Sequence, residues 1–162
     1  MQHEPSTAAG VPAPLNRTPG HLIRRAQQIA VSIFLAECRQ PPVTPIQYAI
    51  LKVLSGEAGL DQISLAHKVA LDRSTLADVA KRLEAKGLLI RAASPNDRRQ
   101  KLLSLSDQGR AVLQAVEPAV ERTQDRILAP LTPEERHSFL GLLNKLVDNN
   151  NEISRAPYKE YA

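Results

Sequence analysis

Apolar side chains recur at helical spacing through most of the chain, and this pattern predicts six helices. A helix that packs on one side places an apolar residue at every third or fourth position. That spacing runs through residues 20–39, 45–56, 61–69, 73–86, 107–128 and 133–149. Thr44, Asp61, Asp72 and Thr132 precede four of these stretches and are residues that cap helices. The pattern therefore predicts a mainly α protein.

Between residues 88 and 105 the apolar pattern changes from helical to strand-like. Leu88–Ala92 and Lys101–Leu105 are predicted strands, and the loop between them is polar and charged. Gly87 ends the helix that precedes them. Two helices followed at once by a two-stranded hairpin form a winged helix-turn-helix, with an α+β character in this segment. In that arrangement the second helix, 73–86, enters a major groove of DNA.

The polar face of the helix 73–86 carries groups that suit a DNA duplex. Cationic side chains contact phosphates, and hydroxyl or carboxylate groups contact base edges. The candidate DNA-binding residues on this helix are Arg73, Ser74, Thr75, Asp78, Lys81 and Arg82. The hairpin adds the candidates Asp97, Arg98, Arg99 and Lys101.

The hairpin and the helix before it also carry a family resemblance. The run Ser94-Pro95-Asn96-Asp97-Arg98-Arg99, followed by Leu103-Ser104-Leu105-Ser106 and Gly109, closely resembles the wing of MarR-type transcriptional regulators. The segment 74–88 resembles their recognition helix and its exit. The resemblance implies that Arg99 is the minor-groove arginine, with Arg98 as the competitor for that role and Asp97 shaping the tip.

The first and last helices are expected to join two copies of the chain. Residues 20–39 carry an apolar stripe too wide for one neighbour, and residues 133–149 expose another. The family resemblance implies dimerisation through residues 20–43 and 107–150. A twofold dimer matches a palindromic operator, because it places its two recognition helices about one duplex turn, roughly 34 Å, apart.

The domain organisation follows from these elements. Residues 20–150 are expected to form one domain, in which residues 44–106 are the DNA-binding lobe. Residues 1–19 hold four prolines and no sustained apolar period, so they are predicted to be a disordered tail. Residues 151–162 are polar and predicted to be frayed. Pro118, inside the stretch 107–128, is expected to bend that helix.

Charge supports a polyanion as partner. The chain has a formal net charge of +4, and residues 61–105 alone hold nine Lys or Arg against five acids, while the rest is balanced. A localised basic surface favours binding to nucleic acid. A single cysteine, no recognisable leader and no apolar run of about 18 residues predict a soluble, cytoplasmic protein without membrane contact.

Catalysis is not expected from the residues present. The four histidines show no metal-ligand spacing, and no phosphate loop, nucleophile elbow or dinucleotide fingerprint occurs. Ser64 and His67 lie one helical turn apart but lack an orienting acid. We therefore expect no enzyme activity, no metal site and no cofactor.

Three modes of action remain open from the sequence. The first, implied by the family resemblance, is a repressor released by a small aromatic carboxylate or phenolic effector. In a crevice for this effector, an arginine would pair with the carboxylate and the tyrosine would stack on the ring. The candidate lining residues are His21, Arg24, Arg25 and Tyr48. The second is a redox switch through Cys38, where a structural cysteine is favoured. The third is an architectural binder without operator preference.

Overall fold

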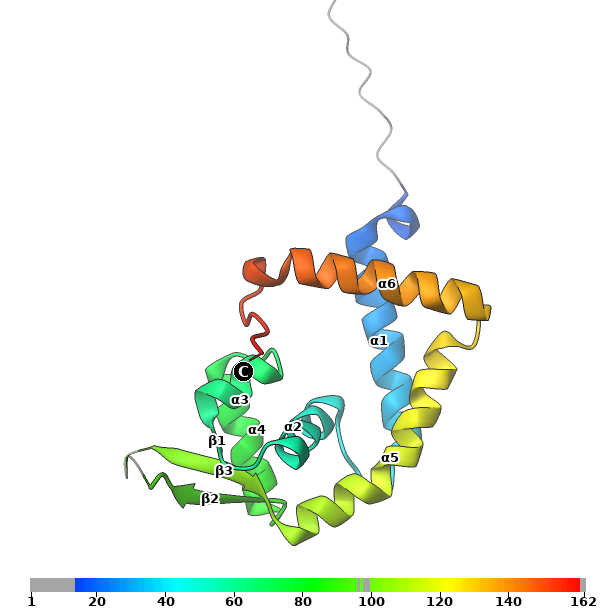
Figure 1. Cartoon of the computed structure of the whole chain (residues 1–162). Helices are drawn as coiled ribbons and strands as arrows, with labels where there is room; N and C mark the ends of the chain where they lie inside the picture. Colours follow the sequence, from blue (N-terminus) through cyan, green and yellow to red (C-terminus); the bar gives the residue numbers. More distant parts are fainter. Residues whose placement is uncertain (1–13, 96, 98–99, 161–162) are drawn as a thin grey trace, which may run out of the picture.

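The computed structural model describes residues 14–95, 97 and 100–160, and within them the chain forms six α-helices and one small sheet (Figure 1). The elements are η1 Leu15–Arg17, α1 Pro19–Glu37, α2 Pro45–Gly56, β1 Leu60–Asp61, α3 Gln62–Lys68, α4 Arg73–Ala85, β2 Leu89–Ala93, β3 Lys101–Leu105, α5 Asp107–Leu128, α6 Pro133–Asn149 and η2 Asn151–Ile153. This architecture confirms the predicted mainly α fold with a winged helix-turn-helix.

The helices begin at the caps that the sequence predicted. Asp61 accepts the backbone N–H groups of Ile63 and Ser64 at 2.8 and 3.0 Å, which satisfies the first turn of α3. Thr44 and Thr132 each close a capping box, and a proline follows each of them as the first helical residue. Local chemistry therefore sets where these helices start.

The end of α4 depends on Gly87, which has a φ of 71°. A side chain disfavours this left-handed conformation, and glycine adopts it freely. The Leu88 N–H then donates to the Leu83 carbonyl at 2.9 Å, which closes the helix end and directs the chain into β2. Ala70 adopts the same conformation, with a φ of 50°, in the turn between α3 and α4. No glycine marks that turn in the sequence.

The sheet has three strands in the order β1-β3-β2, all antiparallel. The predicted wing had two strands, so β1 is an addition: Leu60 pairs with Leu103. In the hairpin, Leu89 pairs with Leu105 and Ala93 with Lys101. The buried leucines of the sheet face the core, and this pairing attaches the wing to the chain segment that enters α3.

The core lies between the helices of the lobe, the sheet and α5, and it is built almost entirely from aliphatic residues. Its largest fully buried side chains are Ile50, Leu51, Leu54, Leu65, Leu76, Leu83, Leu89, Leu103, Val116 and Thr123. One aromatic pair, Phe34 on α1 and Tyr48 on α2, adds a tilted contact with ring centroids 6.1 Å apart. The lobe formed by residues 44–106 is thus packed against the long helices rather than joined to them by a loop alone.

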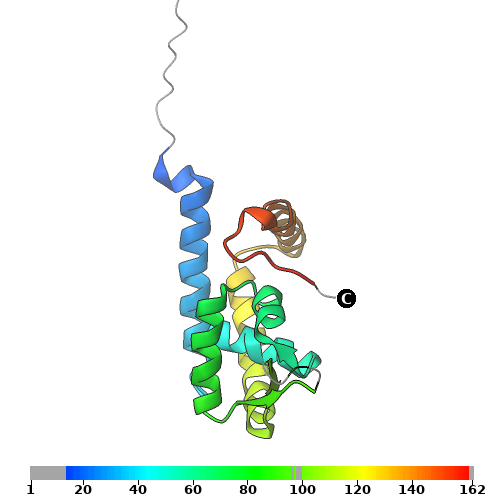
Figure 2. The same cartoon turned by 90° about the vertical axis from the view of Figure 1, so that its left-hand side faces the viewer.

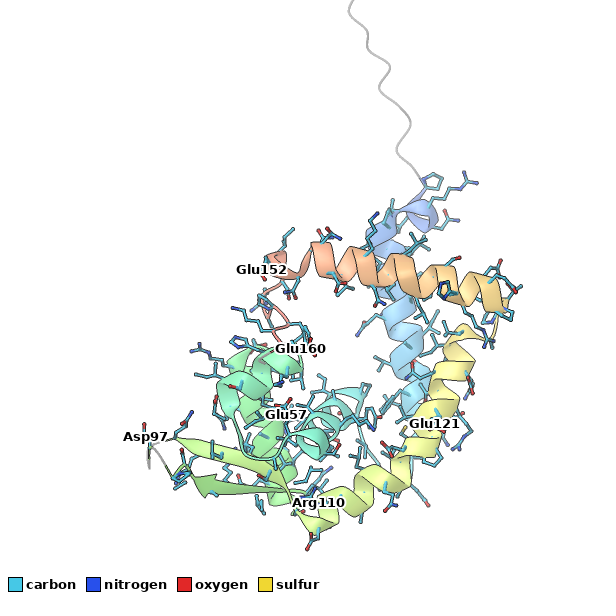
Figure 3. All side chains as sticks on the ribbon, viewed as in Figure 1. Glu57, Asp97, Arg110, Glu121, Glu152 and Glu160 are labelled. Carbon is cyan, nitrogen blue, oxygen red and sulfur yellow. The ribbon has the colours of Figure 1, made fainter. Side chains whose placement is uncertain are left out.

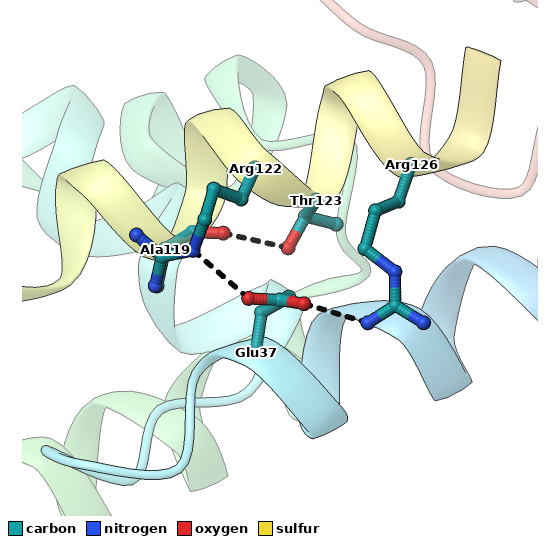
Figure 4. A network of polar contacts seen from close by, with 5 residues as sticks. All are labelled: Glu37, Ala119, Arg122, Thr123 and Arg126. Carbon is teal, nitrogen blue, oxygen red and sulfur yellow. Dashed lines mark hydrogen bonds and ion pairs between the residues drawn. The ribbon is translucent and has the colours of Figure 1, made fainter. Parts of the chain in front are cut away.

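Two arginines of α5 hold the end of α1 (Figure 4). Glu37 accepts Nη1 of Arg126 at 2.6 Å and Nε of Arg122 at 3.0 Å. The same two guanidinium groups hold the pKa of the Glu37 carboxyl below its usual value, Arg126 more than Arg122. α5 contains Pro118, and Figure 1 shows the helix changing direction near its middle, as expected for a proline that removes one backbone hydrogen bond.

The two ends of the chain differ from the tails that were predicted. Of the expected disordered tail, residues 1–19, the first thirteen lie outside the described residues, whereas Leu15–Arg17 forms a turn of 3-10 helix and α1 begins at Pro19. The C-terminal residues 151–160, predicted to be frayed, instead form η2 and run from the end of α6 down to α3 (Figure 2). Hydrogen bonds hold this segment in place, as described below.

The N-cap residue of α4, Asp72, should make the free energy of unfolding depend on pH in the acidic range. The Ser74 hydroxyl, then the N–H and hydroxyl of Thr75, hydrogen-bond to Asp72 and hold its pKa well below the usual value. A pKa lowered on folding stabilises the protein above the unfolded value of about 4, and this stabilisation is lost as pH falls through the folded pKa. The free-energy advantage of wild type over Asp72→Asn should therefore shrink below about pH 4. Urea unfolding at a series of pH values measures it; a pH-independent difference would contradict the assignment.

Candidate nucleic-acid interface

α4 buries one face and presents the other. Leu76, Ala80 and Leu83 are fully buried in the core, which fixes the rotation of the helix. The charged and polar side chains on the remaining face are exposed, and they are Arg73, Ser74, Asp78, Lys81 and Arg82. Three cations and two hydrogen-bonding groups are therefore available to a ligand on one helical surface.

Two of the hydroxyl groups proposed to contact base edges also hydrogen-bond to Asp72, the N-cap residue of α4. Ser74 Oγ donates to Asp72 Oδ1 at 2.6 Å, and Thr75 Oγ1 donates to Asp72 Oδ2 at 2.7 Å. Thr75 is also half-buried. Because both hydroxyl hydrogens are donated to Asp72, the two oxygens can offer a ligand only acceptor lone pairs.

The wing extends away from the long helices, with Asp97 at its free end (Figure 3). The backbone closes the hairpin through Ser94 N–H to the Gln100 carbonyl and Gln100 N–H to the Asp97 carbonyl, each at 2.9 Å. Lys101 is exposed at the start of β3. Arg98 and Arg99, the candidates for the minor groove, lie outside the described residues.

An ion pair that the sequence pattern does not predict joins α4 to the wing. Arg91 Nε of β2 donates to Glu84 Oε2 of α4 at 2.7 Å, and the guanidinium side chain is mostly covered. The pair spans the Gly87 turn, so helical spacing gives no signal for it. Beside it lies a hollow of about 270 Å³ between the first turn of α3 and the wing, lined by Asp61, Gln62, Ile63, Arg91, Gln100 and Lys101.

The four candidate effector residues do not form one crevice within a single chain. Arg24 Nη2 lies 3.4 Å from His21 Nδ1, and both are in the first half of α1 with the exposed Arg25. Tyr48 packs on Phe34, which lies thirteen residues beyond His21 on α1. At 1.5 Å per residue that separation is about 20 Å along the helix.

Cys38 is a buried residue at the C-terminal end of α1. Its side chain is free and only 3 % exposed. Burial raises the pKa of the thiol, and the Thr123 side chain lowers it by less. Oxidation requires an accessible thiolate, so the environment of Cys38 is that of a structural cysteine.

Replacement of this cysteine should leave any response to oxidants unchanged. Cys38→Ser is expected to bind DNA with an affinity within about threefold of wild type before and after mild peroxide treatment. Gel-shift titrations of both proteins with and without peroxide measure this. Oxidant-induced release in wild type that disappears in Cys38→Ser would restore the redox mechanism.

Among the residues 14–95, 97 and 100–160, no three His, Cys, Asp or Glu side chains gather in a way that would hold a metal ion. No helix in the same part has the length and apolar character to cross a membrane.

Comparison with known proteins agrees with this geometry. A model of the MarR family matches residues 43–101. The HTH-type transcriptional repressor NicR of Pseudomonas putida is 32% identical over 145 residues, covering 85% of this chain and 92% of NicR.

Two solved structures extend the similarity to the whole fold. BpsR of Bordetella bronchiseptica has a TM-score of 0.81 at 31% identity, covering 85% of this chain and 99% of BpsR. PcaV of Streptomyces coelicolor, in complex with its natural ligand, has a TM-score of 0.77 at 36% identity, covering 86% and 98%. Winged-helix geometry, wing motif and extended similarity together show that this chain belongs to the MarR family of transcriptional regulators.

Proposed function

We propose that this protein is a homodimeric repressor that binds a palindromic operator and is released from it by a small aromatic acid. The observation that carries the proposal is the exposed polar face of α4. The opposite, apolar face of this helix is buried in the core, and the charged wing follows the helix directly. A helix so presented fits a major groove, and the neighbouring strands reach the adjacent minor groove. The polar groups then supply both phosphate and base contacts.

A second copy of the chain is the occupant best suited to the apolar surface of α1 and α6. An apolar groove of about 400 Å³ lies between α1, the end of α5 and α6. α6 has no buried residue in the single chain, and Leu142 is 69% exposed. Exposed apolar surface of this extent marks a contact site. The large apolar side chains on the two helices are Leu22, Ile23, Ile29, Leu35, Phe139, Leu140, Leu142, Leu143, Leu146 and Val147.

The relatives support an aromatic acid as the effector. The BpsR structure concerns regulation of its DNA binding by 6-hydroxynicotinic acid, an aromatic ring with a carboxylate and a hydroxyl. In this chain His21 and Arg24 offer a hydrogen-bonding group and a cation side by side, and Tyr48 offers a ring. Because one chain keeps them apart, we propose that the effector site forms where α1 of one subunit meets the lobe of the other.

Footprinting on the DNA next to the protein's own gene tests the DNA-binding proposal. The expected result is a protected site with twofold symmetry, and an affinity at least about a thousandfold above that for random duplex at matched salt. Sedimentation should show a dimer, and Leu143→Glu in the apolar groove should weaken it. Equal affinity for both duplexes would instead indicate an architectural binder that contacts phosphates alone.

Titration with aromatic carboxylates tests the effector. A ligand that prefers the unbound state must lower operator affinity, and operator must lower ligand affinity by the same factor. Arg24→Ala and Tyr48→Ala should reduce this coupling with little effect on operator binding alone. Arg17→Ala, also an exposed arginine near the start of α1, is the matched control. If no acid in a panel that includes 6-hydroxynicotinic acid changes operator affinity, the effector proposal fails while the DNA-binding proposal stands.

A further inference from the structure

The C-terminal segment 151–160 connects the end of α6 to α3, two elements that are far apart in the sequence. It leaves the end of α6, in the region proposed to dimerise, and reaches α3 of the DNA-binding lobe (Figures 1 and 2). The Lys159 N–H donates to the His67 carbonyl at 3.2 Å. That carbonyl also accepts the Ala70 N–H in the turn between α3 and α4, so the segment attaches at the helix-turn-helix itself.

Asn151 holds the segment in the shape that makes this contact. Its Nδ2 donates to the Tyr158 carbonyl at 3.0 Å, and its Oδ1 accepts the Tyr158 N–H at 2.8 Å. One side chain therefore satisfies both backbone groups of a residue seven positions later. This two-point clamp closes the loop 151–158 and directs Lys159 toward α3.

The segment also covers a hollow of the lobe. Tyr158 and Glu160 complete the wall of a cavity of about 360 Å³ whose other residues are Lys52, Val53, Gly56, Glu57 and Lys68. Lys68 forms an ion pair with Glu57 at 2.8 Å, and its side chain is only 9% exposed. The acid Glu160 lies at the same cavity, so its charge complements the covered lysine.

We infer that the C-terminal segment is a strap that fixes the angle between the DNA-binding lobe and the dimerisation helices, with Asn151 as its positioning residue. The lobe is then held on two sides, by its packing on α5 and by the strap on α3. This inference rests on the proposed function, because its effect on DNA requires a dimer that reads two half-sites.

The strap should strengthen binding to an operator with two half-sites, because it restricts the range of separations between the two DNA-binding lobes of a dimer. Both recognition helices must enter successive major grooves at once, so lobes that sample many separations lose conformational freedom on binding. A strap that restricts them beforehand removes part of that loss. Binding to a single half-site requires no such spacing and should be independent of the strap.

Hydrogen exchange on the full chain without DNA tests the strap directly. Asn151→Ala should speed exchange of the Tyr158 and Lys159 amides by about tenfold or more. Asn151→Asp keeps the acceptor for the Tyr158 N–H and should fall between wild type and Asn151→Ala. Asn149→Ala is the matched control, because Asn149 Nδ2 donates to the Lys145 carbonyl within α6. Unchanged exchange in Asn151→Ala would overturn the strap.

DNA binding tests its role. With the duplex from the DNA next to its own gene, Asn151→Ala should raise the dissociation constant about threefold to tenfold, while a duplex containing one half-site shows no change and the dimer stays intact. Tighter or unchanged operator binding, or equal weakening on the half-site, would overturn the positioning role. If wild type shows no preference for this duplex, the proposed function fails, and the exchange measurement still decides whether the strap exists.

Discussion

Gly109→Ala is expected to lower the free energy of unfolding by roughly 3 kcal/mol, because the added methyl group would overlap neighbouring backbone atoms. A Cβ at position 109 would lie 2.1 Å from the Leu88 carbonyl oxygen and 3.1 Å from its carbon. Both atoms are backbone, so no side-chain rotation relieves the overlap. The same oxygen accepts the Ser106 N–H at 3.1 Å, a bond that joins the residue before α5 to the residue before β2.

Chemical unfolding of Gly109→Ala in urea measures this loss. The control is Gly56→Ala, at the end of α2, where an added Cβ would meet no atom within 4 Å. That variant should differ from wild type by less than about 1 kcal/mol. A Gly109→Ala protein as stable as the control would show that the start of α5 can move away from Leu88 without loss of packing.

Arg73→Ala is expected to weaken operator binding about tenfold to a hundredfold while leaving stability nearly unchanged. Arg73 is the first residue of α4 and is exposed, and the N-terminal part of a recognition helix is the part that reaches the groove. Loss of a base contact should relax specificity at one position of the operator. Loss of a phosphate contact should weaken binding evenly and reduce the salt dependence by about one ion.

Operator and random duplex titrations at several salt concentrations separate these two outcomes. Lys145→Ala, which removes an equal charge from the exposed surface of α6, is the control. It should leave the salt dependence of DNA binding unchanged, because α6 lies away from the lobe that contains α4 (Figure 1). If Arg73→Ala and Lys145→Ala have equal effects on the dissociation constant, the exposed face of α4 is not the DNA-reading surface.

Local chemistry in the sequence predicted most of the elements correctly. A cap such as Asp72 and a terminator such as Gly87 act on the backbone within a few residues, so they are recognisable without the fold. The apolar stripe of α4 needs only helical periodicity, and the structure buries its members Leu76, Ala80 and Leu83. The wing run, whose motif is also local, identified the family that the comparisons confirm.

Contacts between residues distant in the chain were beyond that reasoning. The strand β1 forms because Leu60 meets Leu103, and two residues alone carry no strand signal. The polar C-terminal segment was predicted to be frayed because its composition gives it no apolar stripe. Its order comes from Asn151 closing a loop on Tyr158 and from the His67 carbonyl of another element.

The helices, their caps, the hairpin and the family could be predicted from the amino-acid sequence, because each depends on residues that are near neighbours along the chain. The burial of Cys38, which is only 3% exposed, and the ion pair of Glu84 with Arg91 across a turn depend on how the elements pack. The same packing keeps His21 and Tyr48 apart within one chain, so the predicted single crevice does not form there. Burial and long-range distance arise only when separate elements pack, and no local pattern of residues encodes them.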